Sequence, residues 1–197
     1  LLDTVKPSMS KDEAYSFFGL QQEKKTVLFM PGSRVQEVQS LYGKMLAAGK
    51  LLQDKVEGLQ FMVPKASTID RHMLEEAARE ANLEVHIGEE RVYDMMNIAD
   101  AAICASGTAT LETALMGVPT LLVYRVNALT YWLSKILVHL DSIGLPNIIS
   151  GHRIMPELWQ DEVTPENIEA AVLPWLVDAA ASEEARHLMT GVRCQMG

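Results

Sequence analysis

The sequence has 197 residues, of which 48% are hydrophobic, and its formal net charge is −9 at pH 7. This length suffices for one domain that buries about 70% of its unfolded surface. The acidic charge excludes a broad nucleic-acid-binding surface, which needs a basic stripe to neutralise phosphates. The two cysteines and five histidines show no spacing typical of a metal site or a disulfide framework. We therefore expect no metal and no cofactor, and we favour a reducing, cytoplasmic location.

The first 22 residues are interpreted as an interdomain connection that leads into a short helix. Ser10 is followed three residues later by Glu13, which is the pattern of a capping box. This pattern predicts a helix over residues 11–18. The chain begins with leucine rather than methionine, and we expect it to be a piece of a longer protein.

Strands and helices alternate through the rest of the chain. The predicted strands are short apolar runs, typical of parallel strands covered on both faces, and they span residues 25–30, 59–64, 83–87, 100–105 and 120–124. The predicted helices span residues 36–53, 70–81, 93–98, 128–140 and 165–177, with further helices beginning near residues 109 and 182. This order predicts an α/β fold, a Rossmann-like three-layer domain with a parallel sheet. We assign residues 23–160 to this domain and residues 161–197 to truncated carboxyl-terminal helices.

Two small polar turns follow predicted strands at their carboxyl ends, where open α/β sheets bind ligands. In the first turn Gly32 permits close backbone approach, Ser33 offers a hydroxyl, and the Arg34 guanidinium suits a phosphate. The second turn, Ser-Gly-Thr at residues 106–108, precedes a helix whose free N–H groups favour an anion. Each turn alone is also consistent with an ordinary strand-to-helix connection. Together they favour a diphosphate site.

Glu112 lies in the first turn of the helix after this second turn. A carboxylate only accepts hydrogen bonds, so it can receive both hydroxyls of a ribose. The alternative, favoured when the residue is considered alone, is that Glu112 complements the helix dipole. Ser106 is interpreted as a binding hydroxyl, because the sequence has no Gly-x-Ser-x-Gly elbow. A dinucleotide fingerprint and a Walker A loop are also missing from the sequence.

The predicted helix over residues 128–140 has one strongly apolar face. Packing in the core explains this face most simply. Contact with lipid or with a missing domain is the alternative.

Six motifs, taken in order, resemble the lipid-A-disaccharide synthase family. They are Pro-Gly-Ser-Arg-x-x-Glu at residues 31–37, Ala-Asp-Ala-Ala at 99–102, Ala-Ser-Gly-Thr-Ala-Thr-Leu-Glu at 105–112, Tyr-Arg-Val at 124–126, Leu-Thr-Tyr-Trp at 129–132 and Leu-Pro-Asn-Ile at 145–148. The resemblance implies the carboxyl-terminal half of a metal-independent, inverting GT-B glycosyltransferase, with residues 23–160 binding the UDP-sugar.

The family joins UDP-2,3-diacylglucosamine to 2,3-diacylglucosamine 1-phosphate in lipid A biosynthesis and releases UDP. The resemblance therefore implies these two partners and a peripheral position at the inner face of a Gram-negative inner membrane. It also implies a missing amino-terminal domain that holds the acceptor and the general base, so no catalytic residue is assigned here. A homodimer is compatible with the resemblance.

The resemblance also implies roles for residues that match the motifs. Ser33 and Arg34 would contact the diphosphate, and Glu37 would support their turn. Asn147 would lie near the donor sugar, Glu112 would hold the ribose, and the backbone near residues 87–93 would meet uracil. The remaining implied donor-binding residues are Ser106, Gly107, Thr108, Ala109 and Thr110.

Two other interpretations stay open at this point. One is another UDP-sugar GT-B enzyme, such as the peptidoglycan N-acetylglucosaminyl transferase or a UDP-N-acetylglucosamine 2-epimerase. The motifs at residues 129–132 and 145–148 speak against it. The other is a nucleotide-binding module that has no catalytic activity of its own.

Overall fold

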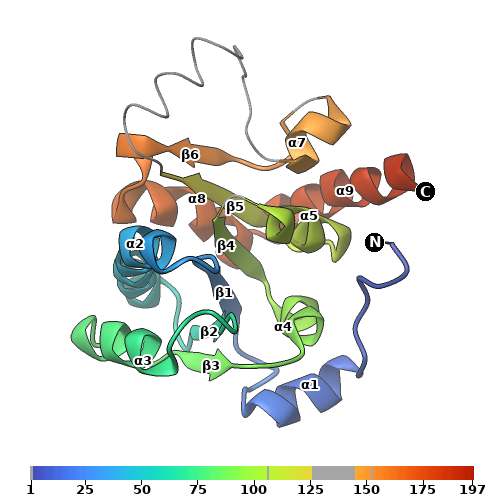
Figure 1. Ribbon diagram of the computed structural model, residues 1–197. Helices are drawn as coiled ribbons and strands as arrows, with labels where there is room; N and C mark the ends of the chain where they lie inside the picture. The colour runs from blue at the N-terminus through green and yellow to red at the C-terminus, as the bar shows by residue number, and fades with distance from the viewer. Residues whose placement is uncertain (1, 106, 126–144, 152) are drawn as a thin grey trace.

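The computed structural model describes residues 2–105, 107–125, 145–151 and 153–197 (Figure 1). In these ranges six strands form one parallel sheet with the order β3-β2-β1-β4-β5-β6. The strands are β1 (Thr26–Met30), β2 (Gln60–Pro64), β3 (His86–Gly88), β4 (Ala101–Ala105), β5 (Thr120–Tyr124) and β6 (Glu157–Trp159). The predicted α/β fold with a parallel sheet is confirmed.

The chain reverses its direction across the sheet at the pair β1 and β4. It builds outward from β1 to β3, returns beside β1 to form β4, and then builds outward in the other direction to β6. The β1–β4 pairing is in register from Val27 opposite Ala101 to Met30 opposite Cys104. Such a reversal leaves a crevice outside the carboxyl ends of the two central strands.

Successive residues of β1 face opposite layers of the molecule. Val27 and Phe29 belong to the core under one layer of helices, whereas Leu28 and Met30 belong to the core under the other. All five residues of β1 and all five of β4 are buried, as expected for strands covered on both faces.

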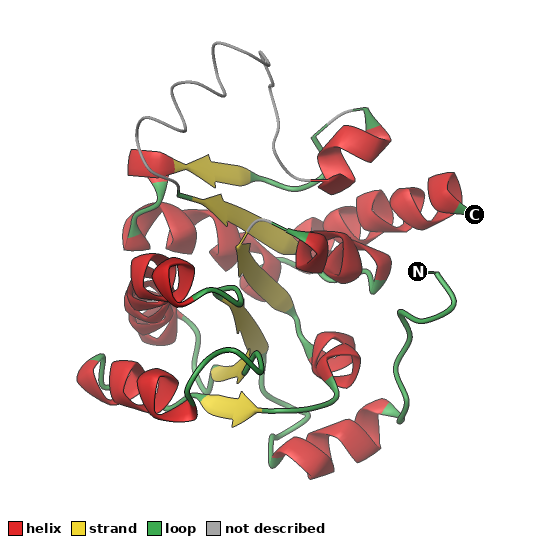
Figure 2. Cartoon of the chain, in the orientation of Figure 1, coloured by secondary structure: helices red, strands yellow, loops and turns green. Residues whose placement is uncertain are grey.

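Helices cover both faces of the sheet (Figures 1 and 2). One layer contains α2 (Val35–Lys55), α3 (Arg71–Glu80) and α8 (Pro165–Val177). The other contains α1 (Lys11–Phe18), α4 (Val92–Ile98), α5 (Thr108–Leu115) and α9 (Ala179–Met196), with α7 (Leu145–Ser150) against α5 and α9. A short 3₁₀ helix, η1 (Gln160–Glu162), follows β6.

Capping residues explain where several helices begin. The Ser10 hydroxyl accepts a hydrogen bond from the Glu13 N–H, so the predicted helix over residues 11–18 is confirmed. Thr164 caps α8 in the same way, ahead of a proline at the first helical position. Helix α9 begins at residue 179, three residues earlier than predicted, because the Asp178 carboxylate accepts hydrogen bonds from the N–H groups of Ala180 and Ala181.

Strand β6 and helix α7 were not predicted. The three residues of β6, Glu-Leu-Trp, show neither an apolar run nor an alternation, and the strand exists because it pairs with β5. Helix α7 has only six residues, beginning with Leu-Pro. The predicted helix over residues 128–140 lies outside the described residues. In the described part of the chain, no helix combines the length and apolarity needed to span a bilayer.

Candidate functional site

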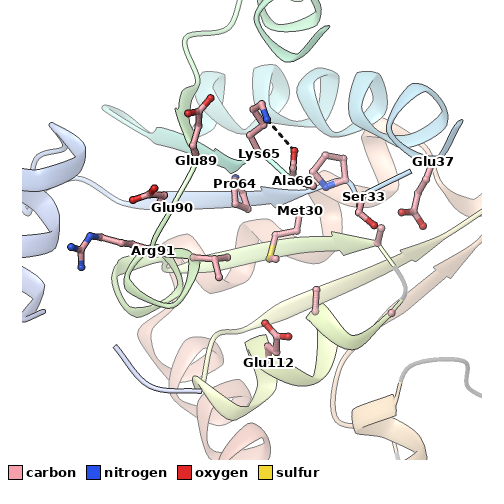
Figure 3. Close-up of a pocket in the computed structure, with 16 residues that line it drawn as sticks. Met30, Ser33, Glu37, Pro64, Lys65, Ala66, Glu89, Glu90, Arg91 and Glu112 are labelled. Atoms are coloured by element: carbon pink, nitrogen blue, oxygen red, sulfur yellow. Dashed lines mark hydrogen bonds between the residues drawn. The ribbon is translucent and has the colours of Figure 1, made fainter. Parts of the chain in front are cut away.

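A cavity of about 530 Å³ lies outside the carboxyl ends of β1, β2, β3 and β4 (Figure 3). Residues 30–33, 64–66 and 89–92 line it, together with Ala105 and Gly107 from the end of β4, Ala109 and Glu112 from α5, and Glu37 from α2. The cavity therefore extends across the β1–β4 reversal, the place where open α/β sheets bind ligands.

The first predicted turn forms one wall and is held in shape by Glu37. The Glu37 carboxylate accepts hydrogen bonds from the backbone N–H groups of Ser33 and Arg34. It also packs on Gly32, whose φ is +107° and where an added Cβ would lie 1.7 Å from Glu37 Oε1. Glycine is therefore required here, both for its backbone conformation and for space. The Thr68 hydroxyl donates to the Ser33 carbonyl and ties the turn to the segment after β2.

The second predicted turn leads into α5 on the other side of the β1–β4 pair. Gly107 is the N-cap, with φ +139°. The Thr110 N–H and hydroxyl both donate to the Gly107 carbonyl, at 3.2 and 2.6 Å, which fixes the turn. The amino terminus of α5 is therefore positioned at the cavity, and that end of a helix carries partial positive charge.

Glu112 projects from α5 toward the cavity, opposite Ser33 and Glu37 (Figure 3). Burial raises the pKa of the Glu112 carboxyl, and a hydrogen bond from the Tyr93 hydroxyl opposes that rise. Burial likewise raises the pKa of Glu37, against the two backbone donors and the charge of Arg34. Burial raises the pKa of the Cys104 thiol, and the negative charges of Glu112 and Glu37 raise it further. Both carboxylates therefore lie near the end of β4.

The cavity has a third wall that no side-chain motif indicated. It consists of Lys65, directly after β2, and of Glu89, Glu90 and Arg91, after β3. The Lys65 ammonium donates to the Ala66 carbonyl at 3.2 Å. The sequence carries no signal for Lys65 beyond its position directly after a predicted strand, because the sheet order places that strand next to β1. Residues 89–92 fall in the stretch where the resemblance implies backbone contacts with uracil.

The Arg91 side chain turns away from the cavity. Its guanidinium donates to Ser8 Oγ at 3.0 Å and lies 5.3 Å from the centre of the Phe17 ring. Figure 3 shows the side chain directed toward the amino-terminal part of the chain. Arg91 contributes to the cavity wall, but the structure directs its charge elsewhere.

The structure brings most of the predicted site residues together. Those that line the cavity are Ser33, Glu37, Gly107, Ala109 and Glu112. Arg34 is exposed at the N-cap of α2, next to the lining residues. Thr108 begins α5, and Thr110 is buried beneath the turn. Ser106 lies outside the described residues.

Asn147 is not among the lining residues. It is buried in α7, and its amide nitrogen donates to the Met155 carbonyl at 2.9 Å and to Glu157 Oε1 at 2.7 Å. Its amide oxygen accepts from the N–H groups of Ile154 and Met155 at 2.6 and 2.9 Å. These four bonds connect α7 to the segment that leads into β6.

The described residues contain no cluster of three or more histidine, cysteine or acidic side chains that could hold a metal ion. Within them, the positive features around the cavity are Arg34, Lys65 and the amino termini of α2 and α5. Neither N-cap residue, Arg34 or Gly107, supplies a side-chain cap. The arrangement suits an anion with donors on two sides.

Solved structures show which fold the chain shares with known proteins. The chain superposes with a TM-score of 0.64 on the C-terminal domain of a group 1 family glycosyl transferase from Francisella tularensis, at 10% identity, covering 98% of this chain and 95% of that domain. It superposes with a TM-score of 0.65 on a UDP-N-acetylglucosamine 2-epimerase described as putative, from Listeria monocytogenes, at 15% identity, covering 94% of this chain and 45% of the other. The fold is that of the C-terminal domain of GT-B glycosyltransferases.

Sequence relatives identify the family. The family model described as lipid-A-disaccharide synthetase matches residues 1–196. The lipid-A-disaccharide synthase of Geobacter metallireducens is 42% identical over all 197 residues, which cover 51% of that relative. The one from Syntrophus aciditrophicus is 40% identical over 193 residues, covering 95% of this chain and 50% of the relative. The chain belongs to the lipid-A-disaccharide synthetase family, and it spans about half the length of these curated relatives.

Proposed function

We propose that the chain forms the donor-binding half of an enzyme that transfers 2,3-diacylglucosamine from UDP to 2,3-diacylglucosamine 1-phosphate. The products would be the lipid A disaccharide 1-phosphate and UDP. The observation that carries the proposal is the meeting of two helix amino termini, those of α2 and α5, at one cavity on the β1–β4 reversal. A diphosphate spreads its charge over two groups, so donors that converge from two helices suit it.

The phosphates are assigned to the side of the cavity formed by the first turn and α5. Ser33 offers a hydroxyl there, Arg34 offers a planar pair of N–H donors, and residues 107–109 offer backbone amides. Glu37 acts by keeping the first turn in place. As UDP leaves, negative charge develops on the diphosphate, and fixed donors stabilise it without a rearrangement.

The ribose is assigned to Glu112 and the uracil to the backbone of residues 89–92. The pKa of Glu112 is raised, yet its carboxylate must be ionised to accept both ribose hydroxyls. The Tyr93 hydrogen bond favours that ionised form. Asn147 is proposed to lie near the donor sugar, with its amide held by hydrogen bonds within the protein.

The acceptor and the general base are assigned to the half of the protein that this chain does not span. Inverting transfer needs a base for the acceptor hydroxyl, and the residues placed here all serve the leaving nucleotide. Closure of two domains around the substrates would align donor and acceptor. Because both substrates carry acyl chains, the whole protein is proposed to work at the inner face of the inner membrane.

Calorimetric titration of the chain with UDP tests the proposal. We expect UDP to bind with the same affinity before and after addition of EDTA, because helix amino termini, Arg34 and Lys65 supply the positive charge that a metal would otherwise provide. UDP-N-acetylglucosamine is the companion ligand. An affinity for UDP that collapses in EDTA, or the lack of any UDP binding, would contradict the proposal.

A further inference from the structure

We propose that Asp94 is a positioning residue: it clamps residues 8–9 of the amino-terminal segment behind loop 89–92 and thereby holds that loop in its ligand-binding shape. The inference rests on the proposed function, because it assigns the nucleoside end of UDP to this loop. It adds a role for residues that do not line the cavity.

The clamp consists of three hydrogen bonds between segments that lie far apart in the sequence. Asp94 Oδ1 accepts from the backbone N–H groups of Ser8, at 2.8 Å, and Met9, at 3.0 Å. Asp94 Oδ2 accepts from Ser8 Oγ at 2.6 Å. Asp94 is 2% exposed, so the acceptor side of these bonds is buried, although Ser8 itself is exposed.

Ser8 also connects Asp94 to the cavity wall, because it is hydrogen-bonded to Arg91. The Ser8 hydroxyl donates to Asp94 and accepts from Arg91 Nη1, so one side chain links the anchor to a lining residue. The Arg91 guanidinium also lies over the Phe17 ring of α1. Both partners of Arg91 thus come from the amino-terminal part of the chain.

Loop 89–92 needs such support because its backbone is strained at Arg91. The φ of Arg91 is +64° and its ψ is +46°, in the left-handed region that L residues other than glycine adopt at a cost. Interactions outside the loop must therefore keep this shape. The hydrogen bond to Ser8 and the contact with Phe17 are interactions of that kind.

Phosphate binding should not depend on this clamp. The first turn is held by hydrogen bonds of Glu37 and Thr68, and the second by those of Thr110, and none of these bonds involves residues 8–9. Loosening the clamp should therefore weaken ligands that carry a nucleoside and spare pyrophosphate. A general loss of folding would affect both ligands alike.

The test compares Asp94→Asn and Ser8→Ala with Ser16→Ala in the same chain. Ser16→Ala is the matched control, because it removes an exposed serine hydroxyl of α1 that takes no part in the clamp. UDP and pyrophosphate are titrated calorimetrically into each protein. We expect both clamp variants to weaken UDP about fivefold or more, with pyrophosphate unchanged and Ser16→Ala like the parent.

Hydrogen exchange of residues 89–92 in the ligand-free proteins is the second readout. We expect faster exchange in Ser8→Ala than in Ser16→Ala. Unchanged UDP binding and unchanged exchange in folded Ser8→Ala and Asp94→Asn would overturn the inference, as would equal losses for UDP and pyrophosphate. If the parent itself does not bind UDP, the proposed function fails, whereas the exchange measurement still decides whether the clamp holds the loop.

Discussion

At the level of single residues, Glu37 and Asn147 show how far a sequence motif can specify the contacts of a side chain. Both were assigned to the donor site by their motifs. Glu37 lies at the cavity, bonded to the backbone of the turn that it follows. Asn147 is buried, and its four hydrogen bonds join α7 to residues 154–157, at the start of β6 and just before it. A motif indicates which residues matter, whereas the partner of each side chain depends on contacts across the fold.

The Arg34 side chain is exposed beside the cavity, so its proposed role is to bind the ligand. Arg34→Ala should weaken UDP binding by about 1.5–3 kcal/mol, the usual contribution of hydrogen bonds to charged groups. Arg79→Ala is the control, since it removes an exposed arginine of α3 that pairs with Glu76. An unchanged dissociation constant for a folded Arg34→Ala protein would show that Arg34 is a surface residue that does not bind UDP.

Asp94 makes stability depend on pH in a defined direction. Burial alone would raise the pKa of this carboxyl, but hydrogen bonds from Ser8 and Met9 and the charge of Arg91 outweigh burial and hold the pKa below its usual value. The stabilisation is therefore present above the unfolded pKa of about 3.9 and is lost as the pH falls through the lower folded pKa.

The Asp94→Asn substitution tests this dependence. Urea unfolding at pH 7 should show a free energy of unfolding lower by about 2 kcal/mol, since bonds to an ionised acceptor are replaced by weaker ones. The difference from the parent should shrink as the pH falls below about 4. A difference that stays constant from pH 7 to pH 3 would show that the Asp94 charge does not contribute.

At the level of secondary-structure elements, helix α2 packs tightly against β1 and β2 at Gly49. An added Cβ there would lie 2.8 Å from Leu83 Cδ2 and 3.0 Å from Phe29 Cζ. Gly43, in the same helix, is exposed and has no atom within 4 Å of such a Cβ. The two glycines therefore differ in packing, although both are unfavourable for helix formation.

We expect Gly49→Ala to lower the free energy of unfolding by about 1–2 kcal/mol through overpacking. Gly43→Ala should raise it by about 0.5–1 kcal/mol, because alanine favours the helix more than glycine does. Chemical denaturation of both variants provides the comparison. Equal stabilisation by the two substitutions would contradict the prediction, because it would mean that Leu83 and Phe29 shift to accommodate the extra methyl group at residue 49.

The elements also show where sequence patterns stop being informative. The sequence predicted four strands, β1, β2, β4 and β5, close to their observed bounds, and caps predicted the starts of α1 and α8. The strand predicted over residues 83–87 overlaps β3 only at residues 86 and 87. Strand β6 could not be predicted, because three residues carry no period and the pairing with β5 is a tertiary interaction. Lys65 was missed for a related reason, since only the sheet order brings the end of β2 to the same cavity as the ends of β1 and β4.

At the level of the whole molecule, the sheet reversal determines where the site is. Strands β1 and β4 are far apart in the sequence but adjacent in the sheet, so the turns that follow them meet. Alternation of strands and helices was enough to predict a parallel sheet and a ligand at its carboxyl edge. The anchoring of residues 8–9 to Asp94 could not be predicted, because it joins segments about 85 residues apart without a shared motif.

The central claim is that this cavity binds the UDP part of the donor, with Glu112 on the ribose. The most direct measurement is calorimetry of the parent chain and of Glu112→Gln, each titrated with UDP and with pyrophosphate. The amide is a weaker acceptor than the carboxylate, so Glu112→Gln should weaken UDP about tenfold, or about 1.4 kcal/mol, and leave pyrophosphate nearly unchanged. Equal losses for both ligands, or no loss for UDP, would contradict the claim and indicate that Glu112 serves the helix dipole or the fold.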